Sequence, residues 1–223
     1  MLILTIKQGK ERSLLQRQPL IYVSAVARVD GKAGERLQSG ITALIQSSSG
    51  KFLARAAYSP QSQIRARVWS FDPTEAIDHA FMKRRVAAAL NKYRKAPGAV
   101  TQTIAAPPAQ LMDGAEDGLS GLRVDWFMRG KGYLICQFFA AGVDAWKVPI
   151  VQALLRETGC PNIYERSAPL MRKAEALPDL SGALAGDAPP ADVLAWYDNE
   201  SAAKTAAPKT VPLVQTAGRS KRR

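Results

Sequence analysis

Two neighbouring segments, 52–58 and 64–71, have the period-two alternation of β-strands, and a Tyr58-Ser59-Pro60 turn joins them. In the second segment the even positions are small or apolar, whereas the odd positions hold Arg65, Arg67, Trp69 and Phe71. A face that combines guanidinium groups with aromatic rings suits a polyanion that carries flat bases. The alternative is an ordinary barrel strand with buried rings and solvated arginines, and the pattern alone favours that alternative.

Residues 1–72 as a whole predict a small mixed β-barrel. Further strands are expected at Leu2–Ile6, Ile21–Arg28 and Ile41–Gln46, with a short helix at Lys10–Arg17. Turns are expected at Asp30–Gly34 and Ser47–Gly50, where glycine and small polar residues satisfy tight backbone geometry. Several short strands at this spacing are typical of a barrel or sandwich.

A basic helix is predicted next, over residues 73–96. The sequence Asp72-Pro73-Thr74-Glu75 has the capping residues of a helix start, and Pro97-Gly98 would end the helix. One face is apolar, and much of the rest is basic at Lys83, Arg84 and Arg85. This basic face is either simply solvated or part of one path for an anionic polymer shared with the barrel.

Residues 73–186 then predict a small α/β domain, so that the fold class is α+β. Its elements are a hairpin of Leu122–Trp126 with Tyr133–Phe139, a helix over Asp144–Thr158 and a strand over Asn162–Arg166. Residues 187–223 are rich in Ala, Pro, Ser, Thr and Lys with little periodicity, which predicts a disordered tail.

The positive charge is concentrated in the first part of the chain. The 223 residues carry a net charge of +12, and residues 1–100 hold 17 Lys and Arg against 6 Asp and Glu. Such a surface neutralises phosphates and releases counterions, which favours nucleic acid over other anionic partners. No basic amphipathic helix with a broad aromatic face favours a membrane, and no apolar run is long enough to span one.

Catalytic, cofactor and metal sites find no support in the residue pattern. His79 is the only histidine, and Cys136 and Cys160 have neither zinc spacing nor a neighbouring base. The acidic loop 113–118 is predicted to be a polar turn, because its order of residues is not that of an EF-hand. Two cysteines without a secretory signal favour a reducing, cytoplasmic location.

Four segments also carry a family resemblance. They are Gly9–Leu15 with Gln18-Pro19, residues 54–73, Glu116–Asp125 and Ile163–Ser167. In this order they resemble the PUA domain and middle domain of bacterial class I SAM-dependent large-subunit rRNA methyltransferases that modify cytosine at ring position 5. The resemblance covers roughly residues 1–186.

The resemblance implies that the chain binds RNA, and specifically large-subunit rRNA. The SAM-binding catalytic domain of that family is expected to be absent, so SAM is a cofactor of the family and no catalytic or cofactor residue is assigned here. The chain also departs from the family where Gln18-Pro19-Leu20 replaces His-Pro-Trp and Ser120 replaces a proline. The residues predicted to contact RNA are Arg12, Arg17, Lys51, Arg55, Tyr58, Arg65, Arg67, Trp69, Lys83, Arg84 and Arg85.

Three hypotheses follow. The first is an RNA-binding module that corresponds to the substrate-recognition half of such a methyltransferase. The second is a split or truncated enzyme that is active only when another chain supplies the SAM domain. The third is an adaptor whose barrel binds an acidic protein.

Overall fold

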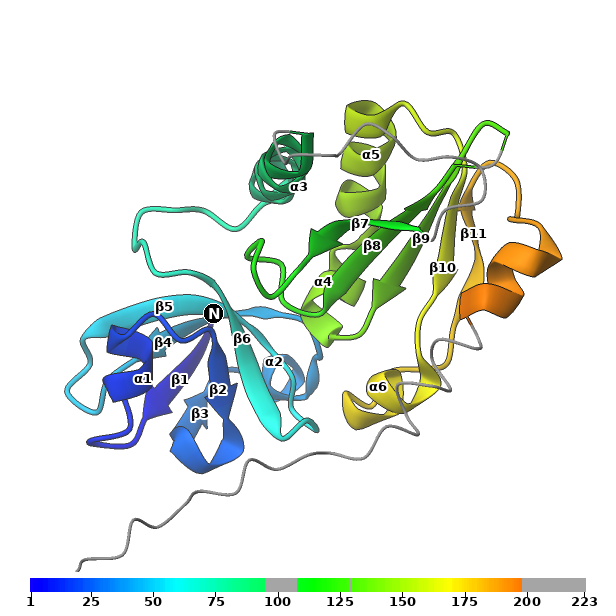
Figure 1. The fold of residues 1–223 in the computed structure, drawn as a ribbon. Coiled ribbons are helices and arrows are strands. Elements are labelled where there is room, and N and C mark those ends of the chain that lie inside the picture. The colour runs from blue at the N-terminus through cyan, green and yellow to red at the C-terminus, as the bar shows by residue number, and fades with distance from the viewer. Residues whose placement is uncertain (95–107, 129, 198–223) are drawn as a thin grey trace, which may run out of the picture. The chain divides into compact units, whose positions relative to one another are not determined.

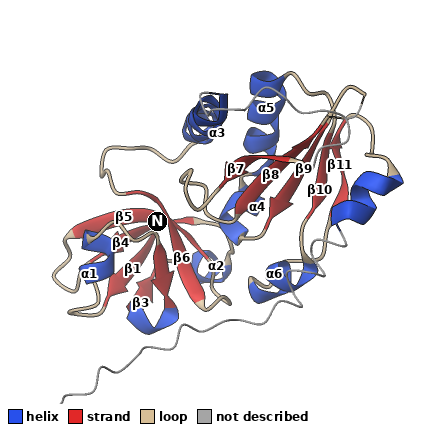
Figure 2. Cartoon of the chain, in the orientation of Figure 1, coloured by secondary structure: helices blue, strands red, loops and turns tan. Residues whose placement is uncertain are grey.

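The computed structural model describes residues 1–94, 108–128 and 130–197. The chain divides into two compact units, residues 1–189 and residues 190–223. The first unit contains two mixed β-sheets, one of six strands and one of five (Figures 1 and 2). The first sheet has the order β2-β6-β5-β4-β1-β3, and the second has the order β11-β10-β9-β8-β7.

The first sheet is built from residues 2–70. Its strands are β1 (Leu2–Ile6), β2 (Leu20–Tyr22), β3 (Val26–Asp30), β4 (Thr42–Gln46), β5 (Phe52–Tyr58) and β6 (Ile64–Ser70). Two short helices, α1 (Arg12–Leu15) and α2 (Ala33–Leu37), and the 3-10 turn Val23–Ala25 complete it. β1 pairs with β4 in parallel, and the other neighbours are antiparallel. Buried aliphatic residues such as Leu4, Ile21 and Ile45 form its core.

The single strand predicted over Ile21–Arg28 is wrong, and the reason explains the curl of the sheet. The 3-10 turn Val23–Ala25 breaks the segment, so that β2 pairs with β6 whereas β3 pairs with β1. β2 and β3 therefore lie at opposite edges of the sheet order although only three residues separate them. Because so short a connection brings both edges close together, the sheet has to curl.

The turn predicted at Asp30–Gly34 is only partly a turn, because α2 begins at Ala33. Glu35 supports this helix start: its carboxylate accepts a bond of 2.9 Å from the backbone N–H of Lys32 and one of 2.8 Å from the amino terminus. These two donors lower the pKa of Glu35. The sequence did not predict α2, because a segment of only five residues that contains a glycine has the pattern of a loop.

The helix start predicted at Asp72 is also wrong. Asp72 caps a local turn, in which its Oδ1 accepts bonds from the backbone N–H (2.8 Å) and hydroxyl (2.6 Å) of Thr74. The helix α3 (His79–Arg94) begins later, after Asp78. The Oδ1 atom of Asp78 accepts a hydrogen bond of 2.7 Å from Phe81 N–H in the first turn of this helix. The predicted helix end at Pro97-Gly98 lies outside the described residues.

The second sheet confirms the predicted hairpin and the strand that follows it. Its strands are β7 (Ala109–Asp113), β8 (Leu122–Phe127), β9 (Tyr133–Phe138), β10 (Ile163–Arg166) and β11 (Ser181–Ala185). β9 and β10 are parallel, and the other neighbours are antiparallel. The sequence did not predict β7, β11 or the short helix α6 (Pro169–Ala174).

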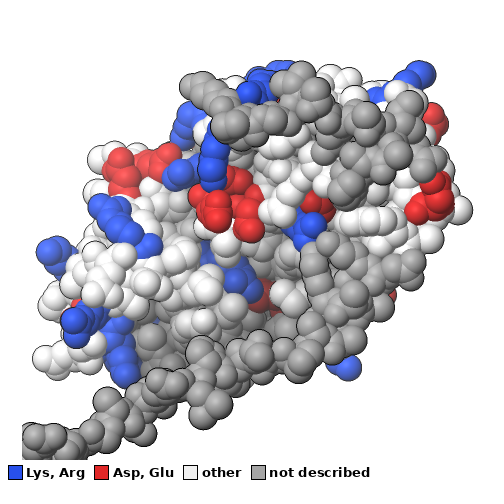
Figure 3. Space-filling view, viewed as in Figure 1, with Lys and Arg blue, Asp and Glu red and all other residues white. Residues whose placement is uncertain are grey.

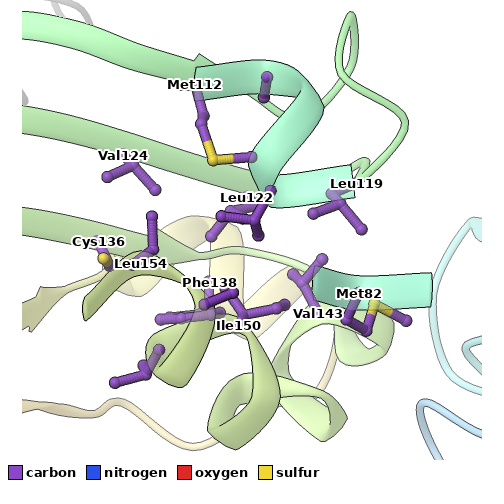
Figure 4. Close-up of a cluster of buried hydrophobic side chains, with 14 of the residues drawn as sticks. Met82, Met112, Leu119, Leu122, Val124, Cys136, Phe138, Val143, Ile150 and Leu154 are labelled. Carbon is purple, nitrogen blue, oxygen red and sulfur yellow. The ribbon is translucent and has the colours of Figure 1, made fainter. Parts of the chain in front are cut away.

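The helix predicted over Asp144–Thr158 is in fact two helices, α4 (Ala141–Ala145) and α5 (Lys147–Thr158), with Trp146 between them. Pro149 is the third residue of α5, a position whose N–H has no partner within the helix in any case. α5 connects the parallel pair β9–β10 and packs against α3 (Figure 1). Met82, Leu122, Phe138 and Ile150 meet in the core beneath these helices (Figure 4).

In the second unit, residues 191–197 are helical. They fall within the segment 187–223 for which disorder was predicted, and residues 198–223 lie outside the described residues. No described helix combines the length and the apolar character needed to cross a bilayer.

The two sheets of the first unit meet where backbones approach closely. A Cβ added to Gly142 of α4 would lie 2.4 Å from Ala57 Cβ and 2.7 Å from Trp69 Cζ2. A Cβ added to Gly40, where φ is +82°, would lie 2.5 Å from the carbonyl oxygen of Ala141. Both positions therefore need glycine.

We expect Gly142→Ala to lower the free energy of unfolding by about 1–3 kcal/mol, the range for an overpacked core, although alanine is the better helix former. The matched control is Gly34→Ala in α2, where an added Cβ meets no atom within 4 Å. That change should stabilise by about 0.5–1 kcal/mol. Urea unfolding of both variants measures the difference, and equal midpoints would show that α4 does not need the close contact.

Candidate nucleic-acid interface

Four of the predicted RNA contacts are cations whose side chains form neither a salt bridge nor a hydrogen bond with any described residue. Arg12 in α1, Arg17 just after α1 and Lys51 just before β5 are exposed, and Lys83 is half-buried on α3. On the face drawn in Figure 3, several Lys and Arg side chains lie on the left, over the first sheet, and others lie along the top and near the centre, where Asp and Glu side chains are also present. These free cations are the groups best able to meet phosphates.

Arg17 is held in place by an aromatic ring. It has a left-handed backbone, with φ of 62°, and its guanidinium carbon lies 4.9 Å from the centroid of the half-buried Phe71 ring. This distance is within the range of a cation–π contact. The contact orders the side chain while its charge remains exposed.

Arg55 and Arg65 instead make bonds inside the protein. Arg55 Nη2 donates to the carbonyl oxygen of Pro73 at 3.1 Å, and Arg65 Nη1 donates to the carbonyl oxygen of Pro60. Both side chains are half-buried. They brace the turn between β5 and β6 and the segment after β6, which limits the donors left for a ligand.

Arg67 pairs with the buried carboxylate of Glu175, the residue that follows α6. Its Nη2 lies 2.7 Å from Glu175 Oε1, and the side chains are 12% and 3% exposed. Glu175 also accepts bonds from the hydroxyls of Ser59 (2.8 Å) and Ser62 (2.7 Å) and a longer one of 3.4 Å from Ala141 N–H. Arg67 therefore joins the two sheets of the first unit.

Tyr58 and Trp69 are buried, at 4% and 3% exposure. Trp69 packs edge-on against Phe81, with ring centroids 6.4 Å apart, and contributes to the core of the second sheet. Their burial does not fit the predicted stacking on RNA bases. It fits the alternative that the alternation pattern favoured, a strand with buried rings.

The basic residues of α3 differ in whether their side chains are exposed to solvent or contact other parts of the protein. Arg84 lies 3.6 Å from Glu75, and Arg85 lies 3.3 Å from the same carboxylate. Arg85 also donates to the carbonyl oxygen of Trp69 at 3.3 Å and lies over the ring of Phe81. Arg84 is exposed and Lys83 lacks a salt bridge with the described residues, so these two remain available, whereas Arg85 is structural.

A second buried network lies at the end of the second sheet, and no pattern in the sequence predicted it. Arg172 is fully buried and donates to the carbonyl oxygen of Phe138 (2.8 Å), to Asp144 (2.9 Å) and to Glu165 (3.4 Å). Lys147 pairs with the same two carboxylates, at 2.9 and 2.8 Å. Because these charges pair with one another, the cluster has the character of a structural network.

Neither cysteine has the character of a nucleophile. Burial, helped by nearby carboxylates, raises the pKa of Cys136, and burial also raises the pKa of Cys160. Both thiols are therefore neutral near pH 7, whereas the thiolate is the reactive form. Within the described residues, no group of His, Cys, Asp and Glu is arranged to hold a metal ion.

The sequence was compared with known proteins. Residues 4–71 match the PUA-like domain family. The chain is 38% identical over 189 residues to ribosomal RNA large subunit methyltransferase I of Aliivibrio fischeri (strain ATCC 700601 / ES114). It is 40% identical over 188 residues to the enzyme of the same name from Escherichia coli (strain K12). The similarity is therefore to large-subunit rRNA methyltransferases and, over residues 4–71, to PUA-like domains.

The alignments cover 85% and 84% of this chain but 45% of each relative, so the chain spans about half the length of the relatives it matches. Two solved structures share the fold. A proposed SAM-dependent methyltransferase from Streptococcus mutans aligns with a TM-score of 0.65 at 16% identity, over 85% of this chain and 44% of that one. A proposed methyltransferase complexed with SAH aligns with a TM-score of 0.63 at 15% identity and the same coverage.

We expect Glu175→Ala to lower the free energy of unfolding by about 3–5 kcal/mol, because it leaves Arg67 partly buried without its partner. The matched control is Glu116→Ala, which removes a surface partner of Lys92; Glu116 is 72% exposed and Lys92 63% exposed. This control should change stability little, because solvent screens exposed pairs. Chemical unfolding measures the free energy of unfolding of both variants. If Glu175→Ala loses no more stability than Glu116→Ala, the role given to Glu175 is contradicted.

Proposed function

We propose that residues 1–186 are the RNA-recognition part of a SAM-dependent methyltransferase that acts on cytosine in large-subunit rRNA. The observation that carries this proposal is the similarity to large-subunit rRNA methyltransferases across 85% of the chain, with a PUA-like domain at residues 4–71. The positive charge of residues 1–100 supports it, because phosphate neutralisation supplies much of the affinity for RNA.

Within this proposal, Arg12, Arg17 and Lys51 contact phosphates from α1 and the loops beside the first sheet, and Lys83 and Arg84 contact them from α3. Arg84 is exposed although it pairs with Glu75, and the other four form neither a salt bridge nor a side-chain hydrogen bond with any described residue. Arg55, Arg65, Arg67 and Arg85 hold the protein together instead. Contacts of this kind position an RNA by its shape and backbone rather than by reading a long sequence.

We further propose that the SAM-binding step is supplied from outside residues 1–186. The relatives are about twice as long as the region that this chain matches, so a methyl-transfer domain has room in the part of those proteins that is not matched. The SAM domain in this proposal lies outside residues 1–186, either in the same polypeptide or in a separate chain that assembles with it.

RNA affinity should fall as salt rises, and Lys51→Ala should reduce the steepness of that dependence. Each lost phosphate contact lowers the slope of log affinity against log salt by about 0.7 for a single strand. Fluorescence anisotropy with a labelled rRNA fragment measures the slopes. Lys173→Ala is the matched control, because it removes the same charge from an exposed position on α6. If the log affinity of the unmodified protein does not change with log salt, the proposed function is contradicted.

Methyl transfer to rRNA should require a SAM domain in addition to residues 1–186. In an assay with isotopically labelled SAM and undermodified large-subunit rRNA, we expect no incorporation with these residues alone. Incorporation should appear when the remaining part of a relative is added as a separate chain. Transfer by residues 1–186 alone would contradict the proposed division of roles.

A further inference from the structure

A cavity of about 510 Å³ lies between the loop before β4, the segment before α3 and the start of α5. The residues on which the argument depends are Ser39, Thr42, Ile77, His79, Trp146 and Val148. This volume falls in the range of about 300–1,000 Å³ that small-ligand sites occupy. None of the predicted RNA contacts lines it, so it is separate from the free cations described above.

One side of the cavity is a fixed aromatic wall. The rings of His79 and Trp146 meet edge to face, with centroids 5.6 Å apart and an interplanar angle of 85°. Trp146 and Ile77 also pack against the buried core of the second sheet. Because that packing restricts the indole, it provides a flat surface with little loss of side-chain freedom on binding.

Neutral polar groups also line the cavity. Ser39 is half-buried and contributes a hydroxyl to the lining, whereas Thr42 Oγ1 is buried and has no hydrogen-bond partner among the described residues. The lining contains no Asp, Glu, Lys or Arg. A phosphate would therefore lack a permanently charged partner and a metal ion would lack a carboxylate ligand, whereas a flat, neutral ring with hydrogen-bonding edges matches this lining.

We propose that this cavity receives one unstacked base of the bound RNA, with Trp146 as the stacking surface and the Ser39 hydroxyl as a hydrogen-bond partner for the base edge. The inference rests on the proposed function and specifies where it engages a base. Unstacked bases in single-stranded RNA bind to proteins by this combination of aromatic stacking and edge hydrogen bonds. It also reassigns the stacking role from the buried Trp69 to Trp146.

A charge placed at the mouth of the cavity tests this assignment. Val148 is 66% exposed at the second residue of α5, and Leu170 is 67% exposed at the second residue of α6. Val148→Asp and Leu170→Asp therefore add the same charge at matched positions, but only the first lines the cavity. We expect Val148→Asp to weaken binding of a single-stranded RNA of about 12 nucleotides roughly tenfold, and Leu170→Asp to weaken it much less.

The second measurement asks whether the base itself is recognised. The same RNA with abasic nucleotides keeps every phosphate but lacks bases, so the unmodified protein should bind it about tenfold more weakly. In Val148→Asp and in Trp146→Ala this preference should disappear, and Trp146→Phe should retain part of it. Ser39→Ala, which removes only the hydroxyl, should reduce the preference while thermal unfolding stays close to that of the unmodified protein.

The outcomes separate the two proposals. If the unmodified protein binds neither RNA, the proposed function fails. If it binds both RNAs equally, or if the two aspartate variants weaken binding equally, RNA recognition stands and the cavity has no part in it. If free adenosine or cytidine binds the unmodified protein while Val148→Asp leaves RNA affinity unchanged, the cavity serves a free nucleoside and the inference is overturned.

Discussion

The carboxylate of Glu175 is the group on which the arrangement of the first unit depends. A carboxylate that is 3% exposed has lost its water, and it is tolerated only where other donors replace that water. Three of its donors, Ser59, Ser62 and Arg67, come from β6 and the turn before it, whereas Glu175 itself follows α6. The charge is therefore satisfied only when the two sheets are docked.

Apolar packing and this polar contact act on the same surface. Gly142 lets α4 approach Ala57 and Trp69, and the same approach brings Ala141 N–H to 3.4 Å from the Glu175 carboxylate. Packing contacts of this type contribute stability but tolerate small shifts in register. A buried ion pair contributes less net stability, yet it is costly to break, so here it selects one docked arrangement. The fixed geometry is also what forms the cavity that Thr42 and Trp146 share.

Local patterns in the sequence were enough to predict β5, β6 and the hairpin of β8 with β9, because period-two alternation depends only on neighbouring residues. They failed where two local signals compete. Asp72 and Asp78 both cap a backbone turn, and only the packing of Phe81 and Met82 into the core decides which one begins α3. Similarly, no local signal in Ile21–Arg28 shows that its two ends pair with different strands.

The candidate site was harder to predict for a related reason. A strand face of arginines and aromatic rings can pack against nucleic acid or against another part of the same protein. Guanidinium groups bind carboxylates and phosphates through the same kind of hydrogen bonds, so the residue types do not distinguish these partners. Arg67 meets a buried carboxylate within its own chain, at Glu175, and Trp69 packs against α4. At these two positions the alternation therefore corresponds to a contact between the two sheets and their helices. The sequence places Glu175 more than a hundred residues from Arg67, and only the fold brings them together. What distinguishes Arg12 and Lys51 from Arg67 is therefore neither residue type nor spacing but the lack of a described acidic partner.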